Sequence, residues 1–271
     1  MGRNFLLIIT IFYTCVYSNL NGQDTLELSH QITLPDSGKI TIDQMGILYL
    51  IKGLEVIKLD KKGSVLNRYS NNILGDITHI DVSNPLQILL FYRDQSQIVF
   101  LDNTLSEQKQ GISALHVSDA YITQSCNSNN GGFWVYNATN LELQKRDKSS
   151  GLSSSSNNLS LVVGENIEPT FLKESNNIIQ VLTDSALFLF DNKVNFIKKL
   201  PLKGRRFLNY HHEIFTSQEQ HYIYFLDTQT FENKKYYIPY AMDSAQIYST
   251  HHFVYLLEGK NLKVFVIPKG P

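Results

Sequence analysis

The sequence predicts an all-β fold, a six-bladed β-propeller with four-stranded antiparallel blades, in a single domain spanning residues 23–271. Three observations predict it. A unit of strands and turns recurs about every forty residues, which is the period of a propeller blade. Strand-like runs of Ile, Leu, Val, Phe and Tyr dominate, and no dozen residues carry a helical apolar stripe. One spare strand near the start matches one missing strand at the end.

The third strand of each unit marks the repeat, because it runs into a turn that usually begins with Asp. These strands close at positions 60, 102, 147, 191, 227 and 267, so the successive spacings are 42, 45, 44, 36 and 40 residues. Asp occupies the first five positions, and Pro268 follows the sixth. An Asp that begins a turn accepts hydrogen bonds from the backbone ahead of it, so each one is expected to hold its turn.

The other strands of the units take their places around this marker. First strands are expected at 39–42, 77–80 and 120–123; second strands at 47–51, 88–92, 133–136, 178–182 and 253–257, with a weaker one at 214–217; and fourth strands at 65–69 and 194–199. Several of these runs are apolar at consecutive positions, which is typical of strands that are covered on both faces. Stacked blades would cover them in this way.

The two ends of the chain fit a closed ring. The sixth unit stops after its third strand, 262–267, whereas an extra strand at 26–34 precedes the first unit. This extra strand is expected to complete the sixth blade and to remove the exposed edges that an open sheet would leave. The serine-rich segment 148–158 is expected to be a polar loop that replaces the outer strand of the third blade.

Composition excludes several classes of protein. The 271 residues include 24 Lys and Arg against 25 Asp and Glu, and 42% of the residues are hydrophobic, so a disordered chain or a long charged arm is excluded. With only 2 Cys, the chain is not a disulfide-stapled scaffold.

The first 22 residues are expected to be a secretory signal. Arg3 is followed by a nearly unbroken apolar run from Phe5 to Tyr17, which is too short to span a bilayer. Cleavage is expected after Ser18 or Gly22, and processing as a lipoprotein at Cys15 is an alternative. The predicted location is therefore periplasmic or cell-envelope associated, with no membrane span.

Candidate metal ligands are few. Two histidine pairs, His211–His212 and His251–His252, are adjacent in sequence, and adjacent side chains of a strand point to opposite faces. Asp residues expected near turns between inner strands could bind calcium in the central channel, but turn capping explains them better. These residues are Asp43, Asp81, Asp184 and Asp243. We expect no metal site and no cofactor.

No catalytic motif is present. The sequence has no G-x-S-x-G elbow and no H-E-x-x-H, and Cys126 has no protease signature around it. Gly131–Gly132 precedes a strand, so it does not predict a phosphate loop. The basic spots 203–206 and 234–235 are expected to be solvated turns, and no nucleic-acid partner is expected.

Aromatic residues leave two interpretations open. Some of them could stack on sugars or on a partner protein, although most are expected to fill the wedges between blades. The candidates are Phe91, Tyr92, Trp134, Tyr236, Tyr237 and Tyr240.

The second unit carries a resemblance to a known group of proteins. The runs from Ile80 to Tyr92 and from Ile98 to Asn103, with Asp94 between them, resemble a signature of uncharacterised exported propeller proteins from Bacteroidota. The likeness extends more loosely over most of the chain. It implies an exported propeller and, through some members, an accessory periplasmic subunit of the type IX secretion system. The signature residues, which we expect to be structural, are Asp81, Ser83, Asn84, Pro85, Phe91, Tyr92 and Asp102.

The expected function follows from the missing catalytic motifs, the closed ring and the resemblance. We expect a non-enzymatic interaction module that docks on an envelope protein or a secretion-complex subunit. One alternative is a propeller that binds glycans or peptidoglycan fragments through aromatic residues at the channel mouth. A second alternative is a calcium-dependent propeller hydrolase.

Overall fold

The computed structural model describes most of the chain after the expected signal. It describes residues 25–108, 120–149, 151–201, 205–208, 213–219, 221–227, 230, 232–240, 242 and 245–268, with the backbone alone at 205–208, 213–219, 226, 227 and 233. The predicted signal, with Cys15 and both cleavage positions, lies outside these residues.

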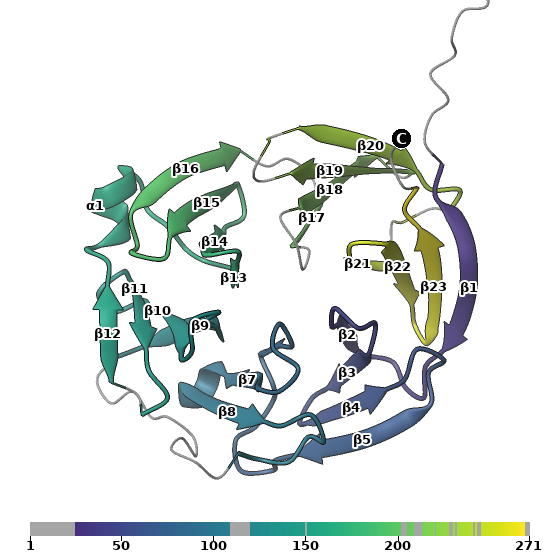
Figure 1. The fold of residues 1–271 in the computed structure, drawn as a ribbon, viewed down its shortest axis with the longest axis horizontal. Coiled ribbons are helices and arrows are strands. Elements are labelled where there is room, and N and C mark those ends of the chain that lie inside the picture. Colours follow the sequence, from purple (N-terminus) through teal and green to yellow (C-terminus); the bar gives the residue numbers. More distant parts are fainter. Residues whose placement is uncertain are drawn as a thin grey trace, which may run out of the picture.

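Six antiparallel sheets are arranged around a central space (Figure 1). Sheet 1 holds β2 (Lys39–Ile42), β3 (Leu48–Lys52), β4 (Glu55–Leu59) and β5 (Val65–Ser70). Sheet 2 holds β6 (His79–Asp81), β7 (Ile88–Tyr92) and β8 (Gln97–Leu101), with the short 3-10 helix η1 (Arg93–Gln95) between the last two. Sheet 3 holds β9 (Ile122–Asn127), β10 (Phe133–Asn137), β11 (Glu142–Arg146) and β12 (Leu152–Ser155).

The second half of the ring follows the same plan. Sheet 4 holds β13 (Phe171–Ser175), β14 (Ile178–Leu182), β15 (Ala186–Asp191) and β16 (Phe196–Pro201). Sheet 5 holds β17 (Arg205–Leu208), β18 (Glu213–Glu219), β19 (Tyr222–Asp227) and β20 (Asn233–Tyr237). Sheet 6 holds β21 (Gln246–Ser249), β22 (Phe253–Glu258), β23 (Asn261–Val266) and the first strand of the chain, β1 (Glu27–Thr33).

The predicted propeller with mainly four-stranded antiparallel sheets is confirmed. Five sheets have four strands, whereas sheet 2 has three in the part of the chain that the structure describes. Beside β8 the described chain continues only as far as Gln108, whose N–H donates to the carbonyl of Phe100 at 2.9 Å. The prediction of four strands in every blade is therefore confirmed for five sheets only.

The first strand closes the ring as predicted. β1 pairs antiparallel with β23, from Glu27 opposite Val266 to Thr33 opposite Asn261. Ile32 and Leu34 are buried against sheets 6 and 1. Burying a side chain of this size contributes about 1.5–3 kcal/mol, so the amino-terminal strand contributes apolar packing as well as its backbone hydrogen bonds.

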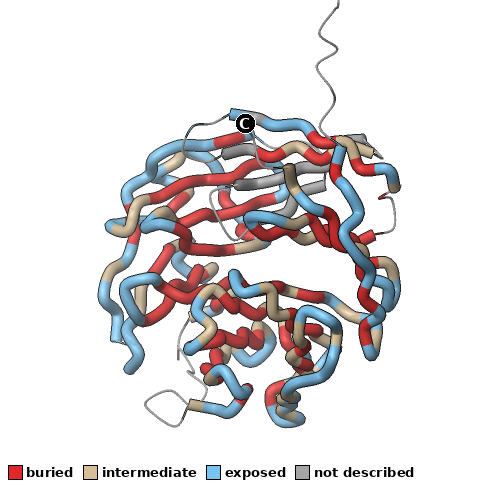
Figure 2. Tube along the Cα trace, turned by 45° about the vertical axis from the view of Figure 1, so that its right-hand side comes forward, coloured by how far each residue is buried: buried red, intermediate tan, exposed pale blue. Residues whose placement is uncertain are grey.

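Sheets 1, 2, 3 and 6 are each covered on both faces by neighbouring sheets. The residues of β7 are all buried, and Phe91 packs against Phe100 and Phe133 between sheets 2 and 3. In Figure 2 the buried residues follow the strands inside the ring, whereas the outer strands and the turns are mostly exposed. The outer strand β5, for example, has no fully buried residue.

The Asp-ended strands form the turns that the sequence predicts. Asp60 Oδ1 accepts hydrogen bonds of 2.8 Å from the N–H groups of Lys62 and Ser64. The same bonds, from the second and fourth residues ahead, recur at Asp102, Asp147 and Asp191. The side chain of Asp227 is outside the described part. One carboxylate oxygen therefore holds each of these four outer turns.

Two features differ from the sequence prediction or go beyond it. Segment 148–158 is not merely a loop, because its residues Leu152–Ser155 form the outer strand β12, paired with β11. An outer strand pairs on one side and faces solvent, so serine is accommodated there without apolar neighbours. A five-residue helix, α1 (Leu159–Val163), follows, capped by the side chain of Asn158 and ended by Gly164.

Within the described residues, no helix is long and apolar enough to cross a membrane.

Candidate functional site

The candidate site is a cavity of about 350 Å³ in the centre of the ring. It is lined by the first strands of four sheets, β2, β6, β13 and β21, together with residues that flank them. In β2 the more exposed Lys39 and Thr41 alternate with the buried Ile40 and Ile42. Polar side chains and apolar side chains therefore both reach the cavity wall.

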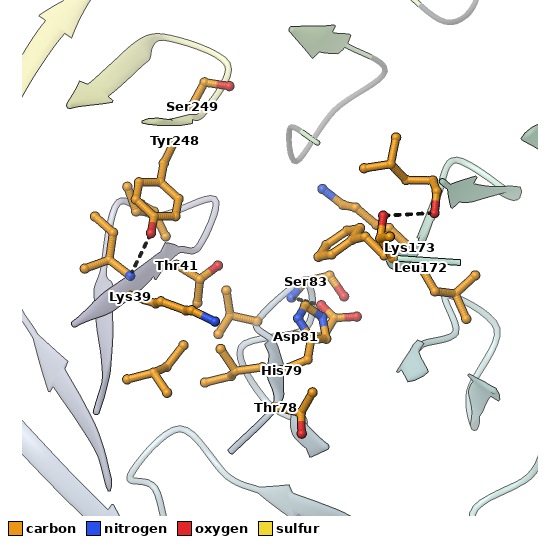
Figure 3. A pocket seen from close by; sticks show the side chains of 18 of the residues that line it. Lys39, Thr41, Thr78, His79, Asp81, Ser83, Leu172, Lys173, Tyr248 and Ser249 are labelled. Atoms are coloured by element: carbon orange, nitrogen blue, oxygen red, sulfur yellow. Dashed lines mark hydrogen bonds between the residues drawn. The ribbon is translucent and has the colours of Figure 1, made fainter. Parts of the chain in front are cut away.

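Three basic side chains and one acidic side chain of the described residues line this cavity, as Figure 3 shows. Lys39 and Lys173 extend into the space from opposite sides, and His79 and Asp81 lie between them. Burial lowers the pKa of His79 to about 4, so its imidazole is neutral at pH 7. Burial also lowers the pKa of Lys173 to about 8, which leaves it largely protonated at pH 7. Among the described residues, two lysines and one carboxylate therefore line the cavity.

Asp81 is the carboxylate of the cavity, and it is also a contact between sheets. Its Oδ1 accepts from the Ser83 N–H at 2.8 Å, and its Oδ2 accepts from the Asn127 N–H at 2.7 Å. The Asn127 side chain donates in turn to the carbonyls of Asp81 and Gln87, at 3.2 and 3.0 Å. This buried network joins the inner ends of sheets 2 and 3.

The other signature residues lie in turns and in the core. Asn84 Oδ1 accepts from the Leu86 N–H at 3.0 Å, and the Gln87 N–H donates to the Asn84 carbonyl, so Pro85 is inside this turn. Phe91 and Tyr92 are fully buried in β7. The structure therefore brings only Asp81 and Ser83 of the signature to the cavity. Asp102 holds the outer turn described above.

The candidate aromatic platforms are mostly inside the sheets. Trp134 is fully buried, and its Nε1 donates to Glu174 Oε2 at 2.6 Å across sheets 3 and 4. Tyr236 is buried, whereas Tyr237 and Tyr240 are half-buried. Tyr240 packs edge-on against Phe265, with 5.5 Å between ring centroids. None of these six residues lines the central cavity.

The histidine and aspartate candidates do not form a cluster in the described part of the chain. His251 and His252 lie between β21 and β22, with ring centroids 4.7 Å apart, so the argument from opposite faces of a strand does not apply to this pair. His211, His212 and Asp243 are outside the described residues. In those that are described, no three His, Cys, Asp or Glu side chains are placed to hold a metal ion.

Two of the aspartates fall in different kinds of turn. Asp43 follows β2, and its Oδ1 accepts from the N–H groups of Met45 and Ile47, at 2.8 and 3.0 Å. Asp184 is exposed in the turn between β14 and β15, the second and third strands of sheet 4.

The remaining candidates lie away from the cavity. Lys235 of β20 lies with its Nζ 3.8 Å from the ring centroid of Tyr222 in the neighbouring strand. Of the basic segment 203–206, only the backbone of residues 205 and 206 is described. Cys126 is buried, and burial raises the pKa of its thiol well above the ordinary value.

Sequence reasoning missed Lys39, His79, Lys173 and Ser249 as neighbours in one cavity. Each lies in the first strand of its sheet, where the surrounding residues are mostly apolar. Once the propeller is known, a polar residue in the first strand of a blade is a sign that the residue lines the central cavity. Single strands do not show which of those residues face each other.

The comparisons with known proteins support the fold. No family model matches the chain, and no curated protein matches it in sequence. A streptogramin B lyase structure is 14% identical, covers 90% of this chain and 88% of its own, and gives a TM-score of 0.58. A chain of the crystal structure of the mitotic checkpoint complex is 10% identical, with 99% and 100% covered and a TM-score of 0.59.

A third comparison concerns secretion. PorZ, an essential bacterial surface component of the type-IX secretion system of Porphyromonas gingivalis, is 10% identical, with 90% of this chain and 38% of that chain covered and a TM-score of 0.49. A TM-score of this size carries no argument. The lyase structure and the chain of the checkpoint complex are 14% and 10% identical to this chain. At such low identities, the likeness shows the β-propeller fold and nothing about activity.

Proposed function

We propose that this protein is an exported, non-catalytic β-propeller that acts as an interaction module of a cell-envelope assembly. The observation that carries the proposal is a set of apolar side chains exposed on the outer edge of sheets 3 and 4, here called the apolar rim. Its residues are Leu152, Leu161, Val162, Phe196 and Ile197. We also propose that sheet 2 is a full blade, so that the ring has six blades of four strands.

The apolar rim is a fixed surface. Figure 1 shows α1 at the outer edge of the ring, beside the outer strands β12 and β16. The buried Leu159 anchors the helix, and its N–H donates to the Leu141 carbonyl at 2.8 Å. The Lys199–Glu165 ion pair, at 2.5 Å, joins β16 to the segment after the helix.

Three side chains of the apolar rim are at least half exposed. Leu161 is 83% exposed, Leu152 is 56% exposed and Ile197 is 50% exposed. Apolar side chains that are exposed together on neighbouring elements are typical of a protein–protein contact. A rigid patch is also favourable for binding, because no ordering of the free protein is needed.

The partner we propose is an envelope protein, and the assembly we propose is the type IX secretion machinery. The predicted signal supports the location, and the resemblance of the segment 80–103 supports the choice of machinery. The glycan-binding alternative through aromatic residues at the channel mouth has less support, because the six candidate rings do not line the cavity.

Quantitative co-purification from the native host tests the proposal. The wild-type protein is expected to recover a defined envelope protein, and the double variant Leu161→Ser with Ile197→Ser is expected to lose it. Leu66→Ser is the matched control, because Leu66 is 49% exposed on β5, in sheet 1. Recovery of the same protein by the double variant, or of no envelope protein by the wild type, would contradict the proposal.

A further inference from the structure

A second cavity, of about 400 Å³, lies between sheets 6 and 1, where the first strand closes the ring. Sheet 6 contributes residues of β1, β22 and β23 to its wall, and sheet 1 contributes β3 and the turns 43–47 and 60–64. The turn between β21 and β22 adds His251 and His252. Every residue of these two sheets and of the turns within them is described with its side chain. The groups that both sheets bring to this cavity, here called the junction pocket, are therefore all placed.

The buried part of the wall is apolar. Ile32, Leu48 and Val264 belong to the buried cluster between sheets 6 and 1. Phe253 is half-buried against this cluster, and its ring lies 6.2 Å from the ring of Tyr255, centroid to centroid. This part of the junction pocket suits the hydrocarbon part of a ligand.

The exposed part of the wall is basic. His30, His251, His252 and Lys61 line it, and none of the described Asp or Glu residues does. The four side chains are all exposed to solvent. An imidazole donates at least one N–H whether it is neutral or protonated, and an ammonium group donates three. Such donors suit an anionic group.

A metal ion fits these histidines less well than an anion does. Among the residues that the structure describes, no three His, Cys, Asp or Glu side chains are placed to hold one. Asp43, the acidic residue next to Gln44 of the wall, does not line the junction pocket. Its carboxylate accepts hydrogen bonds from the backbone of its own turn and from the Tyr49 hydroxyl.

Lys61 is placed at the junction pocket by a glycine of the neighbouring turn. A Cβ added to Gly46 would lie 3.2 Å from Cε of Lys61 and 3.7 Å from its Cδ and Cγ. The methylene groups of Lys61 therefore lie along Gly46, in space that a larger residue would fill. Gly46 has φ of +79°, a conformation that glycine adopts without steric cost. A lysine that packs its methylene groups in this way keeps its ammonium group in solvent at the mouth of the pocket.

We propose that the junction pocket binds an apolar carboxylate, a small molecule with its hydrocarbon part against the buried wall and its carboxylate among Lys61, His30 and His252. A volume of about 400 Å³ is within the range of small-molecule sites. A carboxylate accepts charge-assisted hydrogen bonds from an ammonium group, and these are stronger than bonds between neutral groups. The inference goes beyond the docking function and does not depend on it, because the apolar rim belongs to sheets 3 and 4.

Titration of the purified protein, followed by the imidazole C–H signals in NMR spectra, tests the inference. Hydrocinnamate and octanoate are the probes, and each is compared with the alcohol and the amine of the same skeleton and with acetate. At least one of the two carboxylates is expected to bind about fivefold or more tightly than its alcohol, its amine and acetate. The signals of His30 and His252 are expected to shift as it binds. Binding of hydrocinnamate alone identifies an aromatic ligand, and binding of octanoate alone identifies an aliphatic one.

Three results would overturn the inference. The first is that neither carboxylate binds, or that its alcohol or amine binds equally well. The second is that acetate binds as tightly, because the hydrocarbon part would then contribute nothing. The third is saturation with no shift of the His30 or His252 signals, because the ligand would then lie elsewhere.

A pair of lysine variants tests the carboxylate contact. Lys61→Met is expected to weaken binding of the carboxylate about fivefold or more, because it removes the ammonium group and keeps most of the side chain. Lys62→Met is the matched control, because Lys62 is the next residue of the same turn, is exposed and does not line the junction pocket. Unchanged affinity in Lys61→Met, or an equal loss in both variants, would overturn the inference.

A pair of glycine variants tests how Lys61 is placed. Gly46→Ala is expected to weaken binding as well, because the new Cβ would displace the Lys61 side chain. Gly75→Ala is the control for backbone strain, because Gly75 also has φ of +79° and an added Cβ would have no atom within 4 Å. It is expected to bind the carboxylate normally. If Gly46→Ala does not fold, the lysine pair still decides the matter.

Discussion

The backbone N–H of Asn127 donates a 2.7 Å hydrogen bond to Asp81 Oδ2, across the junction of sheets 2 and 3. The other carboxylate oxygen accepts from the Ser83 N–H. One buried side chain thus holds both its own turn and the neighbouring sheet. The residues are 46 positions apart in sequence, close to one repeat of the propeller.

Replacing Asp81 by Asn is expected to lower the free energy of unfolding by about 2–3 kcal/mol. An amide has one acceptor oxygen, so its NH₂ group would face one of the two N–H donors. Urea denaturation measures the change. Asp94→Asn is the control, because Asp94 is exposed, and it is expected to change stability by less than about 0.5 kcal/mol. Equal stability of the two variants would contradict the role assigned to Asp81.

Gly63→Ala is expected to destabilise the closure of the ring. Gly63 has φ of +87°, and an added Cβ would lie 2.5 Å from Cγ2 of Ile32 in the closing strand β1. The expected loss is about 2–3 kcal/mol, from the backbone strain and the contact together. Hydrogen exchange is expected to quicken in β1, and urea denaturation gives the total.

Gly75→Ala is the matched control for this substitution. Gly75 has φ of +79°, and an added Cβ would have no atom within 4 Å. Its cost is expected to be the backbone strain alone, about 1–2 kcal/mol. If the two variants lose the same stability and the amides of β1 exchange at the wild-type rate in both, the contact with Ile32 does not add to the cost of Gly63→Ala.

The outer-turn aspartates predict a pH dependence that can be measured one residue at a time. Hydrogen bonds from the Thr104 hydroxyl and from the Ser106 N–H lower the pKa of Asp102 below its ordinary value. An Asp whose pKa is lowered by folding stabilises the folded state in full when the pH is above its pKa in the unfolded chain, about 3.9. This stabilisation is lost as the pH falls through its pKa in the folded protein. Thr104→Val is expected to move the pKa of Asp102 back toward the ordinary value in a carboxyl NMR titration.

A threonine elsewhere provides the comparison. Thr33→Val, at an exposed position of β1, is expected to leave the pKa of Asp102 where it is in the wild-type protein. An unchanged Asp102 titration in Thr104→Val would show that the hydroxyl does not set this pKa.

Cys126 is expected to resist alkylation in the folded protein. Burial is the main cause of its raised thiol pKa, so little of the reactive thiolate is present and reagents cannot reach it. Mass spectrometry after iodoacetamide is expected to find this cysteine labelled only after unfolding. Ser185→Cys, at an exposed turn position, is expected to react in the native state. Rapid native labelling of Cys126 at the same rate would contradict its burial.

Part of the candidate site was present in the sequence. Asp81 and Ser83 stood out within the signature, and both line the cavity. Lys173 did not stand out, since a lysine in a strand is ordinarily a solvated side chain. Its neighbour Glu174 accepts a hydrogen bond from Trp134 of sheet 3, whereas Lys173 lines the cavity. Adjacent residues of one inner strand therefore lie in different environments.

The sequence by itself determined the repeat, the Asp-held turns and the closure by the first strand. These depend on local chemistry and on the order of strands: an Asp bonds the backbone two and four residues ahead, and a surplus strand at one end matches a deficit at the other. The tertiary structure alone decided that Lys39, His79, Asp81 and Lys173 share one cavity. Their meeting depends on how far each sheet turns about the common axis, and that angle is set by packing between whole sheets, which no single strand encodes.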